Sequence, residues 1–194
     1  MRTIALLTAP LLLGGCITMK NVAPGAAAKL SDAEAIAVIG MRQPYRVHLQ
    51  LGHVQEDVLH FSTFSSPEAN LFPEHGYIVV KLPAPKATER FSIPMVLPEG
   101  IGLTTRSYVP CAGATAPSFT LKAGAVNYVG HISYDLSQET TAFELALEEE
   151  AAAEFLAATY PELAKSVHLS PMAAMEVAGT DCRPTIYVPI FVPN

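Results

Sequence analysis

Two histidines and an aspartate in the first half of the chain have side chains that can bind a metal ion. On a helix, His53, Asp57 and His60 would share one face and offer two imidazoles and a carboxylate to a divalent metal. In a continuous strand, His60 would lie on the face opposite the other two. We favour solvent-facing polar residues of a strand and its turn, so the sequence predicts no metal and no other cofactor.

A second pair of residue types suits general acid–base chemistry. His131 and Asp135 lie on the hydrophilic side of a predicted strand, and about 13 Å of strand separates them, which is too far for direct contact. The chain has no Gly-x-Ser-x-Gly, Ser-x-x-Lys or His-Glu-x-x-His motif and no phosphate-binding glycine loop. We therefore predict no catalytic residues and no enzyme. The alternative is a small hydrolase or metal-binding protein that uses surface histidines.

The N-terminus has the pattern of a secretory signal peptide. Arg2 provides a positive charge, residues 4 to 13 are mainly apolar, and Gly14-Gly15 provide small residues for cleavage. The apolar run is shorter than the roughly 20 residues that a membrane-spanning helix needs. We predict that residues 1–15 are removed.

The sequence Leu-Leu-Gly-Gly-Cys that ends at Cys16 resembles the lipobox of bacterial lipoproteins. The resemblance implies that Cys16 is acylated and becomes the first residue of the mature chain, and two acyl chains suffice for a stable anchor. Ile17 follows, and the inner-membrane retention aspartate of this class is absent, which by resemblance favours the outer membrane. The domain would face the periplasm or the cell surface.

Charge and length indicate one acidic domain. The formal net charge is -6, and losing Arg2 with the signal peptide makes it -7, which disfavours nucleic acid as a partner. The roughly 180 remaining residues suffice for a single domain. We assign residues 16–34 to the lipidated cysteine and a flexible tether, and residues 35–194 to the β-rich domain.

The other two cysteines predict a disulfide. Secretion exposes Cys111 and Cys182 to an oxidising compartment, and neither lies in a Cys-x-x-Cys motif. Closing the loop from position 111 to position 182 would contribute roughly 4 kcal/mol in the chain-entropy model.

Hydrophobic patterns predict several short strands. Residues 35–41 form a continuous apolar run typical of a buried strand, and Tyr45–Leu51 alternates as a half-buried antiparallel strand does. Residues 53–64 and 77–82 are also interpreted as strands.

Two glycine turns predict hairpins. One joins residues 91–97 to 101–109, and the other joins 119–121 to 126–134 through Gly124. In the last arm, Tyr128 is expected on the same face as Val126, Ile132 and Tyr134. Gly130 interrupts this arm and indicates a bulge or a close backbone approach.

The late part of the chain changes to a helical pattern. Thr141 and Glu144 form a capping box, and apolar residues at helical spacing predict a helix of about 18 residues from Ala142 to Thr159, stopped by Pro161. Its acidic run, Glu148–Glu150, is interpreted as a solvated face. A weaker helical turn at 171–177 and a closing edge strand at 185–192, containing Pro189, follow. The predicted fold is mainly β with one late helix (α+β), an antiparallel β-sandwich of immunoglobulin or transthyretin type.

One block of the sequence resembles a known group of proteins. The segment FTLKAGAVNYVGHISYD (119–135) and the alanine-rich helix ending at Tyr160-Pro161 resemble uncharacterised proteobacterial lipoproteins, in which a β-sandwich with an AGxVxYxG hairpin precedes a late helix. The resemblance implies a fold and a compartment but no catalytic residues. We therefore expect a non-catalytic binding or assembly module, held on the membrane by its lipid, that offers the Pro189 edge strand or the Tyr77 region to another envelope protein.

Overall fold

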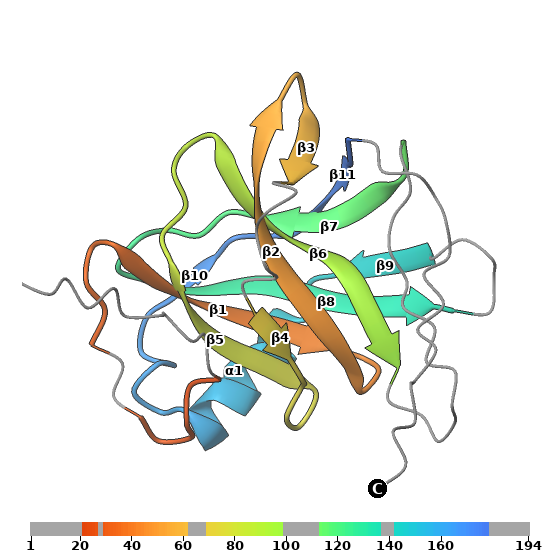
Figure 1. Cartoon of the computed structure of the whole chain (residues 1–194). Coiled ribbons are helices and arrows are strands. Elements are labelled where there is room, and N and C mark those ends of the chain that lie inside the picture. The colour runs from red at the N-terminus through yellow and green to blue at the C-terminus, as the bar shows by residue number, and fades with distance from the viewer. Residues whose placement is uncertain (1–20, 27–28, 62–68, 99–112, 137–141, 179–194) are drawn as a thin grey trace, which may run out of the picture.

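The structure is a computed structural model that describes residues 21–26, 29–61, 69–98, 113–136 and 142–178. In these residues, eleven strands form two sheets, and the single helix α1 lies against one of them (Figure 1). This confirms a mainly β fold with one helix. The three cysteines, the signal-peptide region and the strands predicted at 101–109 and 185–192 lie outside the described residues.

The first sheet, here called sheet A, has the strand order β10-β8-β1-β5, and β9 also pairs with β8. Its strands are β1 (Glu34–Met41), β5 (Tyr77–Pro83), β8 (Val126–Asp135), β9 (Ala142–Ala146) and β10 (Val167–Leu169). β1 pairs antiparallel with β5, but β8 pairs parallel with both β1 and β10. The prediction of purely antiparallel pairing is therefore wrong for this sheet, because the chain forms most of the second sheet before it returns beside β1.

The second sheet, sheet B, is antiparallel and has the order β11-β7-β6-β2-β3, with β4 also paired to β2. Its strands are β2 (Tyr45–Gln55), β3 (Val58–Phe61), β4 (Ala69–Leu71), β6 (Glu89–Pro98), β7 (Thr115–Phe119) and β11 (Ala173–Glu176). The alternation predicted for β2 is present, because Val47 and Leu49 are buried. The two ends of the sheet meet where Ala178 N donates to Leu59 O at 2.9 Å.

Two hydrophobic clusters hold the layers together. The larger lies between the sheets and includes Ile39 and Ile132 from sheet A and Phe91 and Phe119 from sheet B. The smaller lies between sheet A and α1, where Leu156 packs with Ile36, Val38, Val126 and Tyr128. Strand β1 is buried on both faces and contributes side chains to both clusters. Burying one such side chain contributes about 1.5–3 kcal/mol.

The turn at Gly124 joins the two sheets and does not form the predicted hairpin. β7 pairs with β6 and β11 in sheet B, whereas β8 belongs to sheet A. Gly124 has a φ of +66°, which favours glycine, and its N–H donates to Glu34 O at 2.8 Å. The glycine turn was predicted, but the strand partners depended on distant residues.

The helix α1 spans Glu149–Thr159 and has 11 residues, so the predicted length of about 18 is wrong. Residues 142–146 form β9, which pairs with residues 131–135 of β8. This pairing satisfies backbone groups at the edge of β8 and outweighs the helical propensity of the segment. The helix ends before Pro161 as predicted. The weaker helical turn predicted at 171–177 is wrong, because β11 lies there.

The first described residues lie against sheet A and α1. Val22 N donates to Val79 O at 2.7 Å, and Tyr160 Oη donates to Val22 O at 2.9 Å. Gly25 N also donates to Thr159 O at 3.2 Å. This part of the predicted tether is therefore hydrogen-bonded to the domain.

Within the described part of the chain, no helix combines the length and the apolar character needed to cross a membrane.

Candidate functional site

A β-bulge in β8 decides where His131 lies. The register moves from Val38 opposite Tyr128 directly to Ile39 opposite Gly130, which leaves one extra residue in β8. Gly130 has a φ of +105°, and a Cβ there would lie 2.9 Å from Ala146 O. The sequence predicted a bulge or a close backbone approach, and the structure has both.

The bulge shifts the alternation of side chains by one residue. Tyr128 and His131 both lie on the α1 side of sheet A, whereas Val129 and Ile132 join the cluster between the sheets. The predicted placement of Tyr128 and Ile132 on one face is therefore wrong. His131 is only 6% exposed, so its predicted place on a hydrophilic surface is also wrong.

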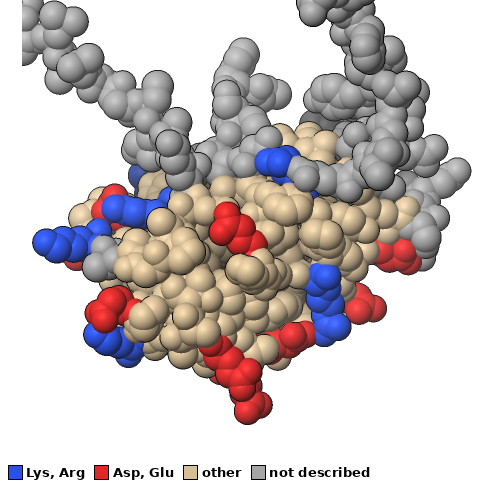
Figure 2. Space-filling model, turned by 90° about the horizontal axis from the view of Figure 1, so that it is seen from below, with Lys and Arg blue, Asp and Glu red and all other residues tan. Residues whose placement is uncertain are grey.

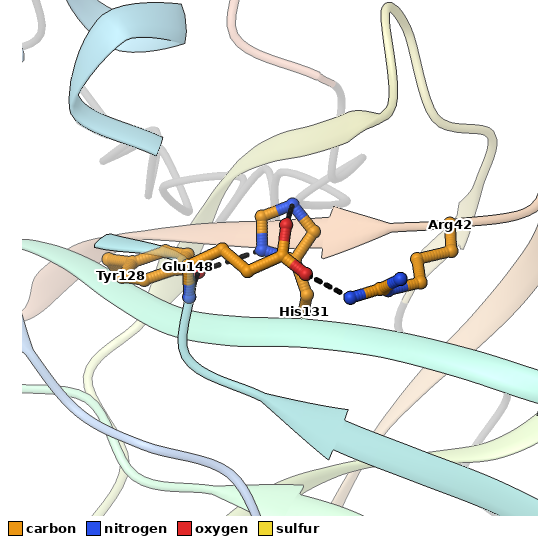
Figure 3. Close-up of polar contacts among 4 residues, drawn as sticks. All are labelled: Arg42, Tyr128, His131 and Glu148. Carbon is orange, nitrogen blue, oxygen red and sulfur yellow. Dashed lines mark hydrogen bonds and ion pairs between the residues drawn. The ribbon is translucent and has the colours of Figure 1, made fainter. Parts of the chain in front are cut away.

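His131 belongs to a chain of polar contacts that runs from the start of α1 to the surface (Figure 3). The backbone N–H of Glu148 donates to Tyr128 Oη at 3.0 Å, and Tyr128 Oη lies 2.8 Å from His131 Nδ1. The hydroxyl can accept from Glu148 and donate its own proton to Nδ1, and in that arrangement the imidazole proton lies on Nε2, toward the Glu148 carboxylate. Nε2 lies 3.8 Å from Glu148 Oε2, and Arg42 donates to the other oxygen of this carboxylate. We call these four residues the His131 cluster.

Aromatic rings and backbone enclose the imidazole. The rings of Tyr77 and His131 meet edge to face with centroids 5.1 Å apart, and Phe155 stacks on Tyr77 at 4.0 Å. On β1, Gly40 leaves room for the imidazole, because a Cβ there would lie 2.2 Å from the ring. Tyr77 is itself buried, whereas residues 74–76 directly before it are exposed.

Burial sets the charges in the His131 cluster. Desolvation lowers the pKa of His131 below its ordinary value, the Glu148 carboxylate opposes this change, and Arg42 reinforces it. Burial also raises the pKa of Tyr128, and it raises the pKa of Tyr77 to about 12. At neutral pH the imidazole of His131 is therefore neutral, and the hydroxyls of Tyr128 and the neighbouring Tyr77 are protonated. Both ring nitrogens already face partners, so the arrangement fastens the start of α1 to sheet A.

The three residues considered as metal ligands lie in a hairpin on the outer side of the molecule. Glu56 and Asp57 have φ values of +52° and +62° and form the turn between β2 and β3. His53 and His60 are direct cross-strand partners, and their rings stack with centroids 5.1 Å apart. The favoured interpretation, polar residues of a strand and its turn, describes this segment, whereas the helix considered from the sequence is absent from it. Asp57, in the exposed turn, is separate from the two histidines, which we call the His53–His60 pair.

A carboxylate lies on the other side of this pair. Glu89 of β6 is the cross-strand partner of His53, so Glu89, His53 and His60 follow one another across three strands. Together with Leu51 and Gly52, they line an open surface hollow. The Glu89 carboxylate accepts a hydrogen bond from Lys86 N at 2.9 Å, which lowers its pKa. Among the described residues, no three or more His, Cys, Asp or Glu side chains are arranged to hold a metal ion.

One edge of sheet A carries exposed apolar side chains. In the described residues, the large hydrophobic side chains that remain exposed are Leu147, Val167 and Leu169. β10 pairs with residues 126–128 of β8, and Leu147 packs beside the neighbouring Gly130. The three side chains therefore gather along a short length of β8. We call them the β10 edge.

His131 and Asp135, the pair considered for acid–base chemistry, are not brought together, in agreement with their predicted separation along the strand. Asp135 ends β8 and pairs with Ala142 of β9, whereas His131 lies under the start of α1. The sequence interpretation missed Arg42, Gly40 and Glu148 as partners of His131. Gly130 was the one signal that pointed to this region, because it marked the bulge.

The chain was compared with protein-family models, with curated proteins and with solved structures, and none of the three comparisons found a match.

Proposed function

We propose that the protein is a cell-envelope lipoprotein, anchored by acylated Cys16, whose domain is a non-catalytic binding module. The observation that carries the proposal is the β10 edge, where Leu147, Val167 and Leu169 are between 39% and 49% exposed. An exposed apolar strand at a sheet edge is a site for strand addition. The partner is an extended segment of another envelope protein.

The backbone of β10 suits this mode of binding. β10 pairs with β8 on one side, and no strand of the described residues pairs with its other side. All three of its side chains are exposed. A partner strand would hydrogen-bond to this free edge and cover Val167 and Leu169.

The charges near the β10 edge indicate the chemistry of the partner. Exposed acidic side chains lie close in the chain to Leu147, at Glu144, Glu149 and Glu150, whereas Glu162 is paired with Lys165, two residues before β10. Uncharged residues cover most of the face shown in Figure 2, and charged residues lie mainly toward its rim. A segment with apolar residues and flanking lysine or arginine would complement the apolar side chains of the β10 edge and the acidic residues near Leu147, and its charges would speed association.

The short N-terminal connection supports a position close to the membrane. Five residue steps separate Cys16 from Asn21, which pairs with Val80 of β5. Five steps span at most about 18 Å. An acyl anchor at Cys16 would thus keep the domain beside the bilayer, and the absence of a retention aspartate favours the outer membrane.

Substitution of Cys16 tests the anchor. We expect wild-type protein to fractionate with outer membranes and to incorporate labelled palmitate, and Cys16→Ser to lose both properties. A Cys16→Ser protein that still fractionates with membranes and is labelled would contradict the lipid anchor.

Site-specific photo-crosslinking in intact envelopes tests the β10 edge. A photoreactive residue at position 167 should cross-link one discrete partner, and Leu169→Lys should reduce this product at least tenfold. Position 120, exposed after β7 in sheet B, is the control and should give no such product. Equal products from both positions, a product unaffected by Leu169→Lys, or cross-links only to a second copy of the chain would each contradict the proposal.

We also propose that Cys111 and Cys182 form a disulfide. Gly113 N donates to Val177 O at 3.4 Å, and the antiparallel β7–β11 pairing runs toward both cysteines. The few residues that separate each cysteine from this contact allow the Cα spacing of about 4.4–6.8 Å that a disulfide requires. Alkylation and mass spectrometry should find these two residues linked in unreduced protein. Two free thiols in freshly isolated envelopes would contradict the pairing.

A further inference from the structure

We propose that His53 and His60 form a two-imidazole binding site for a divalent transition metal of the zinc, copper or nickel class. The two side chains are direct cross-strand partners in the β2–β3 hairpin, and their rings stack with centroids 5.1 Å apart at an interplanar angle of 23°. Imidazole is a preferred ligand of these three metals. The site lies in sheet B, away from the β10 edge of sheet A, so it is independent of the proposed docking function.

The imidazoles are available to a ligand. Within the described residues, neither His53 nor His60 has a hydrogen bond or an ion pair with the protein. His53 is exposed and His60 is half-buried, and both border an open hollow. The ring nitrogens of His53 and His60 therefore have no partner among the described residues and are open to water or to a bound metal ion.

The backbone geometry brings both rings within reach of one ion. Cross-strand partners have Cβ atoms about 4.5–5.5 Å apart. Metal–nitrogen bonds of about 2.0–2.1 Å require the two ligating nitrogens to lie roughly 3 Å apart. Rotation about the side-chain torsions brings the edges of two stacked rings to this separation, so the strands need not move.

The hairpin that carries the histidines is firmly packed. Leu59, the neighbour of His60, is fully buried and contacts Gly52, the neighbour of His53, so closely that a Cβ on Gly52 would lie 2.9 Å from the leucine side chain. Ala178 N also donates to Leu59 O. A rigid support of this kind lowers the cost of ordering two ligands on binding.

The site has two protein ligands. The Glu89 carboxylate beside His53 is engaged by Lys86 through its backbone N–H and its ammonium group, at 2.9 Å and 3.4 Å. Asp57 lies in the exposed turn. Water would therefore fill the remaining positions around the metal, as in an open site and in contrast to a closed structural one.

Metal titration of the purified full chain, produced without a histidine tag, tests the proposal. We expect calorimetry with Zn²⁺, Cu²⁺ or Ni²⁺ to detect a binding step of one ion per chain, and this step should require both histidines of the His53–His60 pair. His53→Gln and His60→Gln should each weaken this step at least tenfold, because glutamine keeps a polar side chain but removes the imidazole. His168→Gln, which removes an exposed imidazole from β10, is the matched control and should bind as wild type does.

Thermal unfolding provides a second measurement. Metal should raise the unfolding temperature of wild type and of His168→Gln but not of either pair variant, and all four proteins should unfold alike without metal. Asp57→Asn should bind like wild type. Metal binding that survives both pair substitutions, that falls equally in His168→Gln, or that is lost in Asp57→Asn would overturn the two-imidazole site.

Discussion

The His131 cluster and the His53–His60 pair place the same side chain in opposite environments. His131 is buried under α1, with Tyr128 on one ring nitrogen and Glu148 facing the other. His53 and His60 lie on the outer surface, and neither makes a hydrogen bond or an ion pair with another described residue. A buried, satisfied imidazole holds two elements together, whereas an exposed pair without partners remains free to bind a ligand.

The difference arises from strand geometry. In β8, one extra residue turns His131 inward. In the β2–β3 hairpin, a two-residue turn aligns His53 with His60 on one face. Local backbone changes of one or two residues therefore decide whether a histidine is structural or available.

The largest effect should come from filling the space beside His131. Gly40→Ala would place a Cβ 2.2 Å from the imidazole, so we expect the free energy of unfolding to fall by about 3 kcal/mol. Denaturant unfolding measures this change. In the exposed pair, His53→Ala should change the same quantity by less than about 0.5 kcal/mol.

A double variant separates the clash from other causes. His131→Ala removes the ring that the new methyl group meets, so Gly40→Ala with His131→Ala should cost less than the sum of the two single changes by about 1 kcal/mol or more. Strict additivity would show that the contact between Gly40 and His131 is not the reason for the loss.

A smaller loss should follow from breaking the hydrogen-bond chain. Tyr128→Phe leaves Glu148 N and His131 Nδ1 without their common partner, and we expect a loss of about 1–2 kcal/mol. Hydrogen exchange should show faster opening of the first turn of α1, whereas β2 and β3 should keep their protection. Equal changes in both regions would contradict a local fastening role.

Lowering the pH should reduce the contribution of the His131 cluster to the stability of the fold. Burial lowers the pKa of His131 in the folded state, with Glu148 opposing and Arg42 reinforcing the change, so the unfolded chain binds the proton more readily. The stabilising contribution is complete above the ordinary histidine pKa of about 6.5 and is lost as the pH falls below it. Denaturant unfolding between pH 7.5 and 5 should show this decrease, and His131→Gln should reduce it. Burial lowers the pKa of His48 as well, so part of the slope should persist.

The smallest effect should come from the surface end of the cluster. The Arg42 side chain is 57% exposed, and it pairs with a Glu148 side chain that is 33% exposed. We expect Arg42→Ala to lower the free energy of unfolding by less than about 1 kcal/mol. Because Arg42 lowers the pKa of His131, this variant should raise that pKa toward its unfolded-state value and so make the acid-induced loss of stability smaller. An acid-induced loss larger than that of wild type would contradict the assigned electrostatics.

The sequence predicted local features better than their partners. The continuous apolar run of β1, the alternation in β2 and the glycine at the β8 bulge were each recognisable, because they reflect burial, strand period and backbone freedom. The partners of β8 were not predictable, because they come from residues 34–41, 142–146 and 167–169. Glu148 was interpreted as part of a solvated acidic face, because nothing in its neighbourhood in the chain indicates Arg42 or His131.

By itself, the sequence determined a mainly β domain with one late helix that ends before Pro161, because hydrophobic period and proline geometry are local properties. The tertiary structure alone decided that residues 142–146 form a strand, that His131 is buried, and that His53 faces His60. Each of these results depends on pairing between strands, and the register of pairing sets the direction of every side chain along a strand.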